Sequence, residues 1–206
     1  MVNDVFAKKY VASHYLSVNV TKRWNLSFFE SIILGDTAQQ RGIDVSFFNP
    51  IIFYRPVEFA VGSRSGNALL GFASSYKLAD GLPLYGQFTL DEFNLEAFAR
   101  QRGSWLNKYA WQLGLKYYDA FKIKGLFARV EYNGARPYTY AHRYPISNYG
   151  HYGQAMAHPW GANFHEALLH LIYQRDRWEV EARYHYGRMG LNTDSVELRG
   201  RHLPKL

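Results

Sequence analysis

The residues best suited to chemistry in this 206-residue chain lie in one stretch, 134–163, where aromatic rings, arginine and histidine recur between three prolines. Aromatic faces stack on the C–H surfaces of sugar rings, and an arginine guanidinium clasps a carboxylate through two parallel hydrogen bonds. The prolines fix the backbone locally, which favours an ordered loop. These residue types predict a binding site for an acidic glycan. The candidate glycan-binding residues are Arg136, Tyr138, Tyr140, His142, Tyr149, His151, Tyr152, His158 and Trp160.

The same loop admits a structural interpretation, which stays open at the level of sequence. In it the aromatic side chains pack over one another and plug the space beneath, while Arg136 pairs with a carboxylate on a neighbouring strand. Histidines at 142, 151, 158 and 165 match no short ligand spacing, so neither a metal nor a cofactor is expected. Asp91, Glu92 and Glu166 supply carboxylates, but no pattern orients them as an acid–base pair, so no enzymatic activity is expected.

A second set of ionisable residues alternates along three segments that we expect to be neighbouring strands. Opposite charges facing each other across strands attract. We therefore predict a ladder of charges that stiffens the wall of a wet lumen, with a role in transport selectivity as the alternative. The ladder residues are Arg129, Glu131, Glu166, Glu181, Arg183 and His185.

The segment 178–186 indicates how these elements are built, because apolar and charged residues alternate along it. Successive side chains of a strand point to opposite faces, so this strand has one apolar face and one ionic face. A water-soluble sheet buries its apolar face, whereas a membrane barrel turns that face toward lipid and its charges toward a wet lumen. The apolar set is Trp178, Val180, Ala182, Tyr184 and Tyr186, and the polar set is Glu179, Glu181, Arg183 and His185.

Alternation with this period recurs in eight segments, which we predict to be strands. Four connections between them are short, and three are long, about 35–67, 92–107 and 134–163, in strict alternation. Such alternation places every short turn at one end of the sheet, which is the plan of outer-membrane barrels with short periplasmic turns and long external loops. The predicted strands are 14–21, 24–28, 67–78, 84–91, 108–117, 126–133, 166–174 and 178–186.

Composition agrees with this plan and narrows the partners. Aromatic residues make up 17% of the chain, which suits aromatic girdles. No apolar run reaches the roughly 18 residues of a membrane helix, and the absence of cysteine excludes disulfides. The net charge of +7 favours acidic partners, but nucleic acid is not expected because aromatic and charged residues lie on opposite faces. The expected partners are outer-membrane lipid, surface polysaccharide or lipopolysaccharide, and other envelope proteins.

We therefore predict an all-β protein, an antiparallel up-and-down transmembrane β-barrel of the bacterial outer membrane, with 1–206 as a single domain. Residues 1–4 carry neither the basic region nor the apolar stretch of a signal peptide. About eight strands also enclose too little space for such long loops. We expect the chain to be a segment of a larger barrel. A soluble β-sandwich that binds carbohydrate, with the aromatic residues in its core, stays an alternative.

Several stretches resemble one family of membrane proteins. An Arg-Pro-Tyr sequence at 136–138 and a His-Pro-Trp-Gly-Ala-Asn sequence at 158–163 are similar, in order and spacing, to the Wzi-like capsule-assembly outer-membrane barrels, including gliding-motility-associated members of Bacteroidota. The resemblance extends over about 19–190 and implies a large monomeric barrel at the cell surface, whose type member is a lectin that retains capsular polysaccharide. It implies capsule or exopolysaccharide attachment or assembly, with a scaffold subunit of a secretion or gliding-motility machine as the alternative. Further stretches of the resemblance are 49–59, 66–71, 84–93, 107–114, 131–140 and 148–163.

Overall fold

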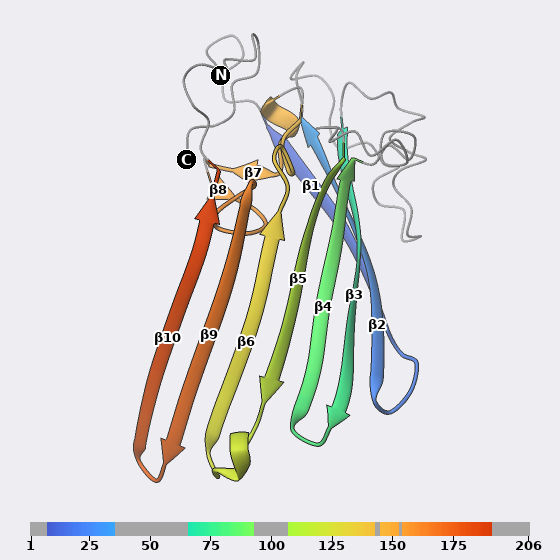
Figure 1. The fold of residues 1–206 in the computed structure, drawn as a ribbon. Coiled ribbons are helices and arrows are strands. Elements are labelled where there is room, and N and C mark those ends of the chain that lie inside the picture. Colours follow the sequence, from blue (N-terminus) through green and yellow to red (C-terminus); the bar gives the residue numbers. More distant parts are fainter. Residues whose placement is uncertain (1–7, 36–65, 93–106, 143–144, 153, 191–206) are drawn as a thin grey trace.

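The protein is all-β in the computed structural model, which describes residues 8–35, 66–92, 107–142, 145–152 and 154–190. Eight strands form one antiparallel sheet in which each strand pairs with the next long strand along the chain (Figure 1). A two-stranded ribbon, β7 (Gly150–His151) and β8 (Gln154–Ala155), lies between β6 and β9 in sequence. The long strands are β1 (Lys9–Asn19), β2 (Trp24–Gly35), β3 (Gly66–Ala79), β4 (Leu82–Glu92), β5 (Lys108–Tyr117), β6 (Leu126–Ala135), β9 (Phe164–Arg175) and β10 (Trp178–Met189).

All eight predicted strands are confirmed, and most extend beyond the alternating pattern. Strand β2 continues to Gly35 through Ile32 and Ile33, where apolar residues occupy both faces and are fully buried. On the apolar side near the same end, His14 and Glu30 face each other across β1 and β2 with 3.0 Å between Nδ1 and Oε1. Alternation therefore ends where the strands approach the longer connections.

The four short turns lie together at one end of the sheet, as the alternation of connection lengths predicts (Figure 1). The β9–β10 turn has two residues, and its first, Asp176, has a φ of 51°, which a tight hairpin turn with this twist requires. The β5–β6 turn contains a short 3₁₀ helix, Ala120–Lys122, and is held by Asp119 Oδ1, which accepts a 2.7 Å hydrogen bond from Gly125 N. The strand ends that lead into the longer connections lie at the opposite end, which we call the loop end.

The sheet is not closed within the described residues. Its two edges are β1 and β10, and neither pairs with the other. The described residues therefore form an open wall of eight antiparallel strands, and the closed barrel stays a prediction. The strands form a single sheet and not two facing sheets, so the sandwich alternative does not describe this architecture.

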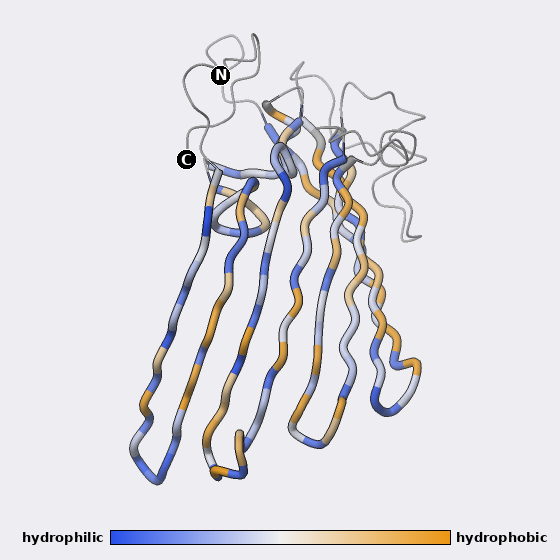
Figure 2. Tube along the Cα trace, in the orientation of Figure 1, coloured by the Kyte–Doolittle hydropathy of each residue, from blue (hydrophilic) through white to orange (hydrophobic). Residues whose placement is uncertain are grey.

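Hydrophobic and hydrophilic residues alternate along the strands (Figure 2), and much of the hydrophobic face is exposed. On the apolar face Trp178 is 69% exposed and Leu113 is 55% exposed, whereas on the polar face Glu166, toward the loop end, is 4% exposed and Arg183 of β10 is exposed. Other exposed residues of the apolar face are Leu16, Val18, Phe28, Leu70, Phe72, Tyr76, Val130, Tyr132, Val180, Tyr184 and Tyr186. Among the described residues, no helix is long and apolar enough to cross a membrane.

Candidate functional site

The loop that joins β6 to β9 crosses the polar face at the loop end. We call its described residues, 136–142, 145–152 and 154–163, the strap. The first residue of the strap is bound to β5, since Arg136 N donates a hydrogen bond to Tyr109 O at 3.0 Å. The last residue is bound to the first, since Asn163 N donates to Arg136 O at 3.3 Å. Its middle reaches the far edge of the sheet, where Lys9 Nζ donates to Asn148 O, Asn148 Oδ1 and Gly150 O at 2.7–2.9 Å.

The strap backbone is locally strained and held by the strand beneath it. Tyr138 and Tyr140 have φ values of 65° and 71°, in the left-handed region that costs a non-glycine residue on the order of 1–2 kcal/mol. Tyr140 N donates a 2.8 Å hydrogen bond to Asp91 Oδ2 at the end of β4, and Tyr140 O accepts one from Tyr149 N at 2.8 Å. These bonds fix the two tyrosine rings 5.9 Å apart with a tilt of 30°.

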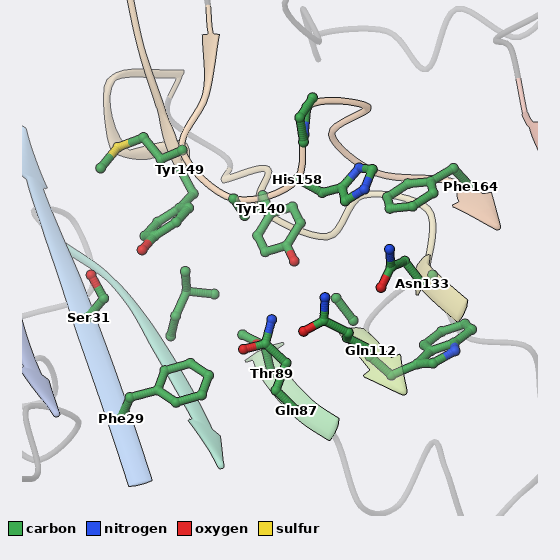
Figure 3. Close-up of a pocket in the computed structure, with 17 residues that line it drawn as sticks. Phe29, Ser31, Gln87, Thr89, Gln112, Asn133, Tyr140, Tyr149, His158 and Phe164 are labelled. Atoms are coloured by element: carbon green, nitrogen blue, oxygen red, sulfur yellow. The ribbon is translucent and has the colours of Figure 1, made fainter. Parts of the chain in front are cut away.

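A cavity of about 370 Å³ lies between the strap and the sheet. Figure 3 shows its two sides: strand residues form the floor, and the rings of Tyr140, Tyr149 and His158 form the opposite wall. Because residues from β2 to β6 reach the same cavity, the polar face of the sheet is its concave face. The main floor and side residues are Phe29, Ser31, Gln87, Thr89, Gln112, Asn133 and Phe164.

Two buried glutamates hold the floor in place. Glu131 accepts hydrogen bonds from the hydroxyl of Tyr85 and, at 2.9 Å each, from Gln112 Nε2 and Asn133 Nδ2. Glu166 accepts a 3.1 Å hydrogen bond from Asn133 Nδ2 and lies 3.0 Å from Nε2 of His158. The amide groups of the floor are therefore oriented from behind by carboxylates.

Within the strap, the phenol of Tyr140 has a clearly shifted pKa. Burial raises the pKa of the Tyr140 phenol above its usual range, and the neighbouring Asp91 and Tyr149 raise it further. The hydroxyl is consequently neutral at any physiological pH. It can both donate and accept a hydrogen bond in the cavity.

Three of the nine predicted glycan-binding residues, Tyr140, Tyr149 and His158, line the cavity. Trp160 packs behind it against Phe164, with ring centroids 5.8 Å apart. The remaining predictions fall outside the cavity lining. Arg136 stacks over the Tyr109 ring at 5.3 Å, Tyr138 and His142 are half-buried in the strap, and His151 and Tyr152 are exposed.

The floor residues Gln87, Gln112 and Asn133 were not predicted as binding residues, because they belong to different strands. The available signal was their common place on the polar face: Gln112 faces Gln87 on one side and Asn133 on the other in the strand register. Gln87, Gln112 and Asn133 therefore form a row of uncharged amides across three adjacent strands, and the strap lies above this row. Only the path of the strap distinguishes this row from the other polar residues of the same face.

The predicted charge ladder is present as two separate clusters. Glu181 Oε1 lies 2.5 Å from His170 Nε2 and 2.6 Å from Arg183 Nη2 on the exposed part of the wall. Glu166 lies between His158 and His185, with 3.2 Å between Glu166 Oε1 and His185 Nδ1. Arg129 and Glu131 interact with each other through their charges outside these two clusters, and Arg129 Nε is buried without a hydrogen-bond partner among the described residues.

Neither cluster resembles a metal centre, and the described residues bring no three His, Asp or Glu side chains together in a metal-binding group. No protein-family model, curated protein or solved structure matches this chain. The resemblance to capsule-assembly barrels thus stays a prediction from the sequence.

Proposed function

We propose that this chain forms part of the wall of a bacterial outer-membrane β-barrel and that its strap and cavity bind surface polysaccharide for attachment or assembly of a capsule. The observation that carries the proposal is the exposure of the two faces of the sheet. Its aromatic and aliphatic face is open, while the polar face is buried toward the loop end around Glu131 and Glu166 and exposed along β10. Lipid is the solvent that favours this arrangement.

The size of the exposed face argues against water as its surroundings. Leaving an aliphatic or aromatic side chain in water instead of burying it costs roughly 1.5–3 kcal/mol when the exposure is complete. The apolar face exposes such residues on six of the eight strands, including Leu16, Phe72, Val130 and Val180, and those of β4 and β9 are half-buried. At half exposure their summed cost approaches the whole stability of a domain, about 5–15 kcal/mol.

The strand lengths and aromatic positions also suit a membrane. A strand of 12 residues such as β10, tilted by about 40°, rises roughly 28 Å, close to the apolar band of about 25 Å in such barrels. Aromatic residues gather near both ends of the apolar face, as interfacial girdles do. Trp24, Tyr76, Tyr173 and Trp178 lie near the turns, and Tyr109, Tyr132 and Tyr186 lie toward the loop end.

The cavity supports the binding half of the proposal. It combines aromatic rings with hydroxyl and amide groups on an ordered strap, and these are the groups that stack on and hydrogen-bond to sugars. A scaffold subunit of a secretion or gliding-motility machine would need the same wall but not the cavity. Glycan binding therefore separates the two functions.

The test of membrane placement is fluorescence quenching by brominated lipid in reconstituted bilayers. A variant retaining only Trp178, with the other tryptophans replaced by Phe, should lose most of its emission because this ring faces the acyl chains. The matched variant retaining only Trp160, a strap residue whose ring packs on Phe164, should be quenched weakly. Equal quenching of both, or a compact monomer that stays soluble without detergent, contradicts the proposal.

A further inference from the structure

We infer that the cavity selects an uncharged sugar ring, held through its hydroxyl groups, and excludes the acidic sugars that the composition of the loop predicts. The inference rests on the proposed function and names the ligand class of the same site. It depends on the orientation of two floor amides, on the charges around them and on the rings above them.

The floor presents hydrogen-bond acceptors to the cavity. The nitrogens of Gln112 and Asn133 are committed to carboxylates, since both donate to Glu131 and Asn133 also donates to Glu166. A carboxylate only accepts, so the assignment of nitrogen and oxygen in each amide is fixed. The oxygens are left for other partners. Asn133 Oδ1 is buried and has no hydrogen-bond partner among the described residues.

The cavity offers an anion little counter-charge, because its one histidine, His158, is already paired with Glu166, with 3.0 Å between Nε2 and Oε2. None of the residues that line it is Lys or Arg, and the floor amides are hydrogen-bonded to the carboxylates of Glu131 and Glu166, of which Glu131 also interacts with Arg129. The cations that belong to the strap or contact it have other partners: Arg136 stacks on Tyr109, Lys9 donates to Asn148 and Gly150, and Lys108 donates to Ala141 O at 2.9 Å. A carboxylate on the ligand would face acceptor oxygens and two buried negative charges, which repel it.

The walls of the cavity carry aromatic rings that can pack on the faces of a sugar ring. The rings of Tyr140 and Tyr149 form a tilted pair on the strap side, and Phe29 lies on the sheet side. Aromatic faces pack against C–H surfaces, while the acceptors of the floor receive O–H donors at the ring edge. A volume of about 370 Å³ is near the lower limit of ligand pockets, roughly 300–1,000 Å³, which suits one or two rings.

The experiment compares matched pairs of sugars that differ only at C6. Binding of the methyl glycosides of glucose, galactose and mannose, and of the methyl glycosides of the three corresponding uronic acids with the same anomeric configuration, is measured by calorimetry on the detergent-solubilised or bilayer-reconstituted chain. We expect the neutral member of at least one pair to bind at least tenfold more tightly than its acid. Equal or tighter binding of the acids, or no binding of any of the six sugars, overturns the inference.

Variants then test the mechanism of selection. Replacement Gln112→Leu removes one acceptor and should weaken neutral-sugar binding about tenfold, while the same replacement at Gln174, exposed beside the β9–β10 turn and outside the cavity, should leave it unchanged. Gln87→Lys adds a cation at the floor and should reduce the preference for the neutral sugar at least threefold. An unaltered preference in Gln87→Lys contradicts the electrostatic explanation. Lipid quenching of Trp178 tests the proposed membrane placement independently. A negative sugar-binding result can therefore be distinguished from failure of the membrane-wall proposal.

Discussion

Lys9 and Asn148, 139 positions apart in the chain, are joined by two hydrogen bonds from one ammonium group, to the backbone oxygen and to the side-chain oxygen of Asn148. Lys9 begins the edge strand β1, and Asn148 lies in the middle of the strap. The strap therefore starts at β6, spans the concave face and is fastened to the opposite side of the sheet. A loop held at both ends and at its middle can keep a cavity open beneath it.

Replacement of Lys9 by Met should loosen the strap without unfolding the wall. A hydrogen bond to a charged group contributes about 1.5–3 kcal/mol, and the Met side chain keeps most of the apolar stem. We expect hydrogen exchange in 145–152 to accelerate at least tenfold, while the β9–β10 hairpin keeps its protection. The control Lys22→Met, in the exposed β1–β2 turn, should change neither region. Unaltered exchange in the strap of Lys9→Met would show that this fastening is unimportant.

Glu166→Gln should weaken the contact between strap and wall. The carboxylate lies between His158 of the strap and His185 of β10 and accepts a bond from Asn133, so its loss removes several charge-assisted contacts at once. We expect a loss of about 1–3 kcal/mol in the free energy of unfolding measured in detergent. Glu179→Gln, on the exposed start of β10, is the matched control and should cost less than about 0.5 kcal/mol. Similar losses in the two variants would contradict the role given to Glu166.

The phenol of Tyr140 should ionise only at a pH well above the usual tyrosine range. Its pKa is raised in the folded protein, whereas the unfolded chain titrates near 10. Stability from this group is therefore complete below about pH 10 and is lost as the pH rises toward the folded-state pKa, because the unfolded state releases its proton first. The difference in absorbance at 295 nm between the protein and Tyr140→Phe measures this titration. A difference that titrates near pH 10 in the folded protein contradicts the burial.

Gly187→Ala should displace Trp160. A Cβ at residue 187 would overlap the indole ring of Trp160, which packs on Phe164 and His158 beside the cavity. Overpacking of this kind costs typically 1–3 kcal/mol. We expect a red shift in the emission of a variant that retains only Trp160, together with weaker sugar binding. Arg188→Ala, at the next position on the exposed side, should leave the spectrum unchanged.

The strands were predictable because each face of the sheet has a uniform environment along most of its length. Apolar and polar side chains must then alternate, and a segment such as 178–186 shows the pattern without any knowledge of its neighbours. The pattern fails at the loop end, where Glu30 pairs with His14 on the apolar side and Ile33 is buried on the polar side. The burial of those residues depends on the segments that cover them at the loop end. The alternation of apolar and polar residues within a strand does not predict which segments these are.

The candidate site was only half predictable for a related reason. The composition of 134–163 indicated Tyr140, Tyr149 and His158, because aromatic residues gather there. It could not identify Gln112 or Asn133, since many polar residues share the concave face and the strap selects the few that lie under it. The row of amides becomes a binding surface through the fastening at Lys9, a contact between parts of the chain far apart in sequence.

If the wall belongs to a closed barrel, its two margins place a parity condition on the strands that complete it. Strands β1 and β10 run in opposite directions, since six strands lie between them and all neighbouring strands are antiparallel. In hydrocarbon the peptide groups along both margins need partners, because no water reaches them. If every added strand is antiparallel to its neighbours, only an even number of additional strands can join the two margins into a ring.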